Sequence, residues 1–121
     1  LKNRVRSFKY AGAGVRDLFR SHANAKIHLL FTGAVLAAGF FFEVSRWEWC
    51  LLILCVAVVL AAEAFNSALE YLVDLVSPGQ HPLAGKAKDI AAGAVLIVAI
   101  GAALVGLLIF IPKALLWLEK F

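Results

Sequence analysis

Three long apolar runs constrain this chain more than any other feature of its sequence. They cover residues 27–43, 47–62 and 90–118, and the helical pattern of the second run continues with polar residues to Val76. A helix needs about 20 residues to cross a hydrocarbon layer of ~30 Å. Each run, with its flanks, therefore predicts one membrane-spanning helix.

The composition agrees with a bilayer as the solvent. The chain has 121 residues, of which 63% are hydrophobic and 17% are charged, against about 45–50% and about 25% in soluble domains. A chain this short cannot bury so much apolar surface within itself. We expect one all-α membrane domain over residues 1–121. Cys50 and Cys55 fall on different faces of a helix, so we interpret them as small apolar residues.

The first 26 residues are polar and basic, with Asp17 as their single acid. Helical spacing places Phe8, Val15 and Leu18 on one face and the arginines and lysines on another. This pattern predicts an amphipathic surface helix over 1–26 that lies in the headgroup layer.

Basic residues also predict the orientation of the chain. Residues 1–26 hold seven lysines and arginines, the loop 77–89 adds Lys86 and Lys88, and the opposite side has three. The amino terminus and this loop are expected in the cytoplasm and the carboxyl terminus outside. Pro112 is expected to end or kink the third spanning helix near the outer surface.

The most informative stretch continues the second apolar run. One arc of roughly 100° of this helix holds five polar residues, Glu63, Asn66, Ser67, Glu70 and Asp74. Glu63 follows fourteen residues without a charge, and an ionisable group at that depth is a candidate functional site. Two simpler interpretations stay open: Asp74 facing water, and Asn66 holding two helices together.

Glu63 and Glu70 are seven residues apart, which corresponds to ~10 Å along a helix. Glu63 and Glu70 are therefore expected to have different tasks. Lys86, Lys88 and Asp89 are expected to open the third spanning helix, where they either meet a nucleotide or serve as ordinary cytoplasmic basic residues. The loop does not match a phosphate-binding P-loop.

Two motifs together resemble the bacterial diacylglycerol kinase and undecaprenol kinase family. They read Glu63-x-x-Asn66-Ser67-Ala68-x-Glu70-x-x-x-Asp74 and Gly85-x-Ala87-Lys88-Asp89-x-x-x-x-Ala94-Val95-Leu96. The resemblance covers nearly the whole chain. It implies a homotrimer of small three-span subunits in the bacterial cytoplasmic membrane, with no nucleic-acid partner. It also implies transfer of the γ-phosphate of Mg-ATP to the hydroxyl of a membrane lipid, undecaprenol or diacylglycerol.

The same resemblance implies roles for individual residues. Glu63 matches the proposed catalytic base, and Glu70 matches a metal-binding carboxylate that would hold Mg²⁺. The residues that match nucleotide-binding and catalytic positions are Asn66, Asp74, Lys88 and Asp89.

One position departs from the family. A second metal-binding glutamate usually precedes a pattern like Asn24-x-Lys26-Ile27-His28, and this chain has His22 there. Imidazole is a poor ligand for Mg²⁺, which prefers oxygen. Four alternatives follow. The alignment with the family pattern is shifted, or His28 or water takes the place of the missing glutamate, or the activity is reduced, or the chain is an inactive member of the family.

Two further classes compete with an enzyme. A small oligomeric channel or transporter would line an ion path with its intramembrane acids, and a non-catalytic assembly protein would use the polar face for packing. The polar face lies on the cytoplasmic half alone and continues into the lysines and acid near residue 88, which favours phosphate chemistry.

Overall fold

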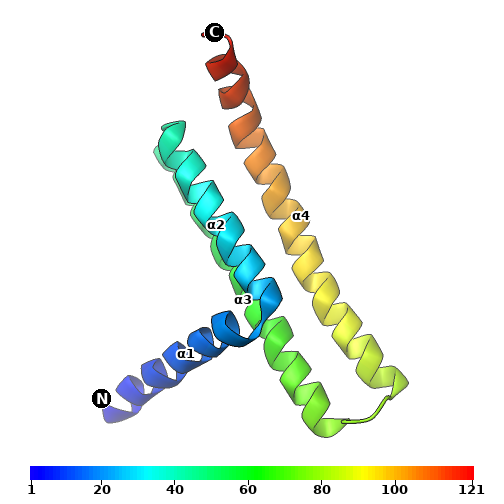
Figure 1. The fold of residues 1–121 in the computed structure, drawn as a ribbon. Coiled ribbons are helices and arrows are strands. Elements are labelled where there is room, and N and C mark those ends of the chain that lie inside the picture. Colours follow the sequence, from blue (N-terminus) through cyan, green and yellow to red (C-terminus); the bar gives the residue numbers. More distant parts are fainter.

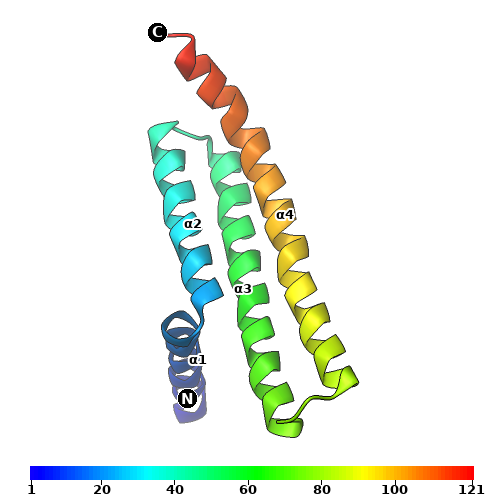
Figure 2. The same ribbon diagram turned by 45° about the vertical axis from the view of Figure 1, so that its right-hand side comes forward.

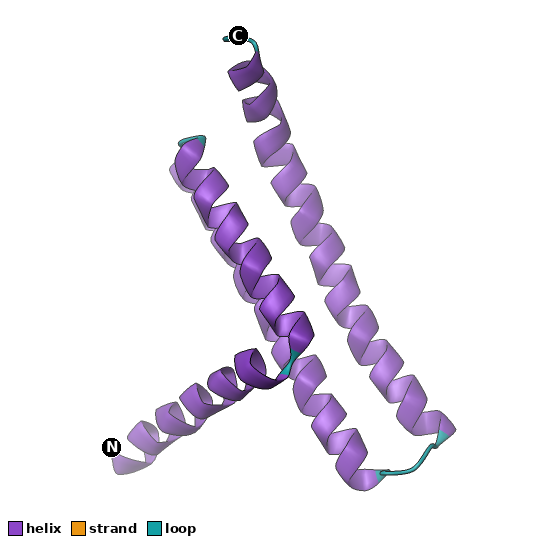
Figure 3. Cartoon of the chain, in the orientation of Figure 1, coloured by secondary structure: helices purple, strands orange, loops and turns teal.

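The computed structural model describes all residues, 1–121, as four helices with no strand (Figure 3). In chain order they are α1 Lys2–Ser21, α2 Ala23–Phe41, α3 Arg46–Val76 and α4 Pro82–Leu118. Three of them, α2, α3 and α4, are long and apolar enough to cross a membrane. The prediction of an all-α chain with three such helices is confirmed.

The three long helices lie side by side, and α3 packs most extensively against α4 (Figure 2). Helix α1 leaves this bundle at a steep angle and meets it partway along α3 (Figure 1). The loop between α3 and α4 lies at one end of the bundle. The turn between α2 and α3 and the carboxyl terminus lie at the other end.

Local capping explains where α3 begins. The Ser45 hydroxyl accepts a hydrogen bond from the Glu48 backbone N–H at 3.2 Å, and Glu48 Oε1 accepts one from the Ser45 N–H at 2.9 Å. This reciprocal pair satisfies backbone donors that a helix start leaves free. Glu48 also forms an ion pair with Lys113 at 3.0 Å, which joins the start of α3 to α4.

Helix α4 begins earlier than expected. Pro82 occupies its first turn, and His81 caps it by accepting a hydrogen bond from the Leu83 N–H at Nδ1, at 3.1 Å. Proline is favoured at this position because its fixed φ suits a helix and it lacks an N–H to satisfy. We expected a loop over residues 77–89, but the loop ends at residue 81 and the prediction is wrong for residues 82–89. Helix α4 also continues through Pro112 to Leu118, so Pro112 does not end the helix.

The expected surface helix 1–26 is also shorter in the structure. His22 has an extended backbone, with φ −117° and ψ 114°, and it separates α1 from α2. Lys26 consequently belongs to α2.

A small apolar core of Val44, Leu52 and Ile109 lies near the α2–α3 turn. Close by, Gly39 is required, because a Cβ there would come within 2.5 Å of the Trp49 ring. Most other large apolar side chains of α2, α3 and α4 are exposed. Surface of this kind in a chain of spanning helices is covered by lipid or by neighbouring subunits.

Candidate functional site

A buried polar face on α3 forms the centre of the candidate site. Glu63 is 2% exposed, Asn66 is 6% exposed and Ser67 is 4% exposed. These residues are three and four positions apart, so the helix places them on one side. The predicted grouping of these three side chains on one face is therefore seen in the structure.

Glu63 has one ion-pair partner in the structure, His28 on α2. Glu63 Oε2 lies 3.7 Å from His28 Nε2, and the His28 side chain is 21% exposed while that of Glu63 is 3% exposed. A buried carboxylate is costly unless it is paired, and His28 supplies a countercharge when it is protonated. Sequence reasoning considered His28 only as a substitute metal ligand and missed this contact.

Two polar atoms beside Glu63 lack a hydrogen-bond partner. They are Asn66 Oδ1 and Ser67 Oγ, and both are buried. Leaving such atoms unsatisfied costs about 1–3 kcal/mol each, so unpaired buried atoms in a native protein call for a ligand, water or neighbouring subunit.

Ser67 also borders a cavity of about 340 Å³ between α1 and α3. Small and apolar residues make most of its wall: Ala11, Gly14, Val15 and Leu18 from α1, and Ala64 and Ala68 from α3. The cavity is therefore mainly apolar, and Ser67 brings a hydroxyl group to its wall beside the buried polar face of α3.

Three further polar residues, Asp17, His22 and Tyr71, line the same cavity. The Tyr71 hydroxyl donates to Asp17 Oδ2 at 2.8 Å, and His22 Nε2 lies 3.1 Å from the Tyr71 oxygen. Because the Tyr71 hydrogen points to Asp17, His22 is the donor to Tyr71. The hydrogen bond from Tyr71, helped by one from Ser21 and by nearby His22, holds the pKa of Asp17 below its ordinary value.

This arrangement bears on the expected metal ligands. His22 is engaged with Tyr71, and the chain has no group of three or more His, Cys, Asp or Glu residues that could hold a metal ion. Glu70 is half-buried on α3 between the buried face and the end of the helix. The expected metal ligands Glu70 and His22 are therefore not brought into a common metal-binding cluster within one chain.

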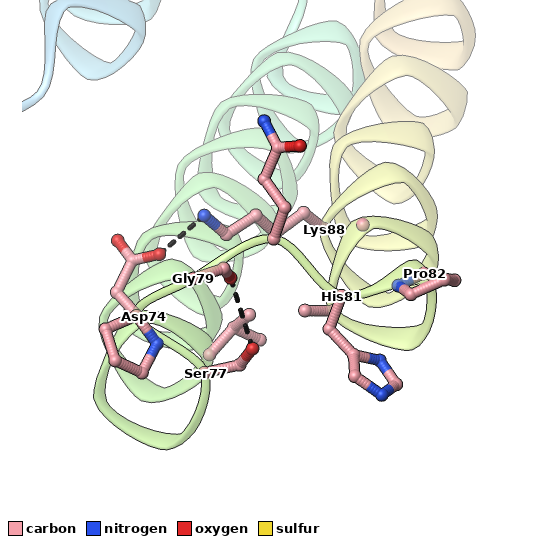
Figure 4. Close-up of a pocket in the computed structure, with 11 residues that line it drawn as sticks. Asp74, Ser77, Gly79, His81, Pro82 and Lys88 are labelled. Carbon is pink, nitrogen blue, oxygen red and sulfur yellow. Dashed lines mark hydrogen bonds and ion pairs between the residues drawn. The ribbon is translucent and has the colours of Figure 1, made fainter.

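A second cavity, of about 820 Å³, lies where α3 ends and α4 begins. Asp74 and Lys88 face each other across it, with the Lys88 ammonium donating to Asp74 Oδ1 at 2.5 Å (Figure 4). The connecting loop, residues 77–81, completes the wall with Gly85.

The predicted nucleotide-binding residues divide between two places. Asp74 and Lys88 line the large cavity, Asn66 lies on the buried face, and Asp89 is exposed outside the cavity lining. Sequence reasoning missed the loop residues as part of this wall. Their signal was the cluster Pro78, Gly79 and Gly85, in a stretch that we compared with a P-loop and found not to match.

Distances along α3 relate the two places. Eleven residues separate Glu63 from Asp74, which corresponds to ~16 Å along a helix, and Glu70 lies between them. A buried carboxylate, a half-buried carboxylate and a lysine–aspartate pair thus follow one another along α3 toward the loop. A reaction between an apolar molecule and a polar one would fit this gradient.

Comparison with known proteins identifies relatives of this chain. Residues 9–110 match the family described as prokaryotic diacylglycerol kinase. An undecaprenol kinase of Bacillus subtilis (strain 168) is 42% identical over 108 residues, which are 89% of this chain and 88% of the relative. A diacylglycerol kinase of Synechocystis sp. is 43% identical over 115 residues, 93% of this chain and 65% of the relative. A diacylglycerol kinase of Pseudomonas aeruginosa is 35% identical over 94 residues, 78% of this chain and 76% of the relative.

Proposed function

The chain belongs to the prokaryotic diacylglycerol kinase family and is a membrane lipid kinase, and from this premise we propose that it transfers the γ-phosphate of Mg-ATP to the hydroxyl of undecaprenol or diacylglycerol. The observation that carries the proposal is the position of Glu63. It is a buried carboxylate between an apolar bundle and a polar cavity on the same helix.

In this proposal Glu63 is the catalytic base. A lipid hydroxyl reaches the enzyme from the apolar layer, and its proton has to be taken up as its oxygen attacks phosphorus. Glu63 is the carboxylate at the boundary between the apolar part of α3 and its polar end. General base catalysis by a positioned carboxylate contributes ~10²–10⁴-fold.

The cavity between α1 and α3 fits the lipid end of the reaction. Its wall is mostly apolar, and Ser67 lies one helical turn from Glu63. We place the first carbons of the lipid acceptor there, with the hydroxyl near Glu63 and the unpaired atoms of Asn66 and Ser67.

The larger cavity fits the nucleotide end. Its volume of about 820 Å³ is within the range of small-molecule sites, and the Lys88 ammonium can pair with phosphate oxygens once it leaves Asp74. Asp74, Lys88, Asp89 and Asn66 are the residues that we assign to nucleotide binding and catalysis.

A magnesium ion fits the donor set through Glu70. Mg²⁺ usually keeps several waters and binds through one or two carboxylates together with substrate phosphates, so one glutamate per chain agrees with Mg-ATP as the bound form. When bound, the ion would neutralise phosphate charge. His22 does not fit this role, because it offers nitrogen and already bonds Tyr71.

The choice of lipid follows from the loop sequence and from the relatives. Residues 73–78 and His81-Pro82-Leu83-Ala84 resemble the undecaprenol kinase branch, and the Bacillus subtilis undecaprenol kinase aligns over most of both chains. We therefore propose a preference for a long polyprenol over diacylglycerol.

Subunit arrangement and orientation complete the proposal. A homotrimer with sites between subunits would cover exposed apolar residues of α2 and α4 and would supply neighbours for a site that one chain leaves open. Helix α1 and the first turns of α2 and α4 lie toward the end opposite the carboxyl terminus, and they hold nine of the twelve lysines and arginines. This supports a cytoplasmic amino terminus and an outer carboxyl terminus, with α1 in the headgroup layer.

Phosphate transfer from ATP to lipid, measured on the purified protein in vesicles, tests the function. We expect radiolabel from γ-labelled ATP in the lipid fraction, dependent on added Mg²⁺ and lipid alcohol. Ion flux across the same vesicles without lipid phosphorylation would instead support a channel or transporter.

A further inference from the structure

We infer that His28 is a positioning residue that takes the proton of each turnover from Glu63 and passes it to water. The inference rests on the proposed function and extends it, because it concerns how the base is reset. The observation behind it is the contact between Glu63 Oε2 and His28 Nε2 at 3.7 Å. The Glu63 side chain is buried, whereas that of His28 is partly exposed.

The stoichiometry of the proposed reaction requires such a step. The lipid oxygen forms a bond to the γ-phosphorus, and the bond from that phosphorus to the bridging oxygen breaks, so that ADP leaves with the electron pair. The proton of the lipid hydroxyl goes to the Glu63 carboxylate. Glu63 must release this proton before it can act again, and one proton therefore has to reach water in every cycle.

Glu63 cannot release the proton directly to solvent, since its side chain is 3% exposed. Of the neighbours on its own helix face, Asn66 is an amide and Ser67 an alcohol, and neither is a useful base at neutral pH. Imidazole is the side-chain group that most readily both takes up and releases a proton, and His28 places one beside Glu63. About a fifth of the His28 side chain is exposed, against 3% for Glu63, and His28 lies in the second turn of α2, near the helix end that we place at the cytoplasmic surface.

Geometry favours His28 over the other titratable groups. Glu63 is the one acid in ion-pair distance of His28, and the nearest cation along α2, Lys26, is exposed and pairs with neither residue. Contacts of this kind are often long in the unliganded enzyme and shorten when substrate binds, or are bridged by one water. The 3.7 Å separation leaves a short path for a proton.

A purely structural ion pair is the competing explanation for the same contact. In that case a positive charge beside Glu63 is all that the protein needs. Lysine supplies such a charge but is already protonated at neutral pH, with an ordinary pKa of about 10.4. His28→Lys therefore separates proton transfer from charge pairing.

The test compares His28→Ala, His28→Lys and His28→Gln in vesicles under saturating Mg-ATP and lipid. We expect each to lower turnover about tenfold or more, since positioned acid–base groups contribute ~10²–10⁴-fold. Added imidazole is expected to restore turnover in His28→Ala, which leaves room for it, with saturation as its concentration rises. It is expected to have little effect on His28→Lys or His28→Gln.

Three results would overturn the inference: full activity in His28→Ala, wild-type activity in His28→Lys without imidazole, or no response of His28→Ala to imidazole. If His28→Ala does not assemble, His28→Gln and His28→Lys decide, because a relay predicts loss in both. The turnover of Glu63→Gln, measured in parallel, tests separately the premise that Glu63 is the catalytic base. If Glu63→Gln stays active, the base assignment is wrong. If it is inactive while the His28 variants keep full activity, the relay alone is wrong.

Discussion

The Tyr71 hydroxyl donates a hydrogen bond to Asp17 Oδ2 at 2.8 Å and so ties α3 to α1. Helix α1 is exposed along most of its length, with Leu18 as its one buried residue. A single cluster of polar contacts at its carboxyl end, which also includes His22, therefore fixes one wall of the cavity between α1 and α3.

Tyr71→Phe is expected to loosen α1 without unfolding the bundle. The change removes the donor to Asp17 and the acceptor for His22 while keeping the ring. We expect faster amide hydrogen exchange in residues 17–22 and little change in α4. Tyr10→Phe is the matched control, because Tyr10 is an exposed α1 residue with no side-chain hydrogen bond. Equal exchange in both variants would show that Tyr71 does not hold α1.

Acid is expected to loosen the same contact. The hydrogen bond from Tyr71 holds the pKa of Asp17 below its ordinary value of 3.8. A carboxyl group with a lowered folded-state pKa stabilises the folded arrangement above its unfolded pKa, and this contribution is lost as the pH falls through the folded-state value. Docking of α1 should thus be constant above about pH 5 and weaken below the ordinary pKa. A fluorescent label on α1, titrated with acid, checks this. The transition should be absent in Tyr71→Phe.

Lys88→Ala is expected to raise the KM for ATP by about tenfold to a hundredfold, the range for losing a hydrogen bond between charged groups. Its ammonium lies in the large cavity, paired with Asp74. Lys86→Ala is the control, since Lys86 is exposed and does not line the cavity. An unchanged KM in Lys88→Ala, or an equal rise in both variants, would contradict the placement of the nucleotide.

Undecaprenol is expected to be the better acceptor. Residues 73–78 and 81–84 resemble the undecaprenol kinase branch, so diacylglycerol is expected to react more slowly. Turnover on the two lipids, measured side by side in vesicles of one composition, decides between them. A preference of tenfold or more for diacylglycerol would reverse this assignment.

The sequence predicted the helices better than their boundaries and contacts. Apolar runs long enough to span a membrane determine α2, α3 and α4, and their lengths follow from the bilayer. Pro82 misled the prediction of where α4 begins, because proline both interrupts a helix and favours its first turn. His22 carries no periodic signal that would reveal its extended backbone.

Within the site, the shared face of Glu63, Asn66 and Ser67 followed from helical periodicity alone. Contacts between helices did not follow. The pairing of Glu63 with His28 depends on how α2 packs on α3, and the bond from Tyr71 to Asp17 joins residues 54 positions apart. Such pairings depend on the angle and register of packing, which a single sequence does not contain.

The most direct test of the account is the turnover of Glu63→Gln on lipid and Mg-ATP, in protein shown to be assembled. The change is nearly isosteric and removes a carboxylate that burial disfavours, so assembly should survive. We predict turnover ~10²–10⁴-fold below the wild type, whereas Glu70→Gln should mainly weaken the response to Mg-ATP. Glu119→Gln, at the far carboxyl end, should keep normal activity. Near-wild-type turnover in assembled Glu63→Gln would contradict the assignment of Glu63 as the base.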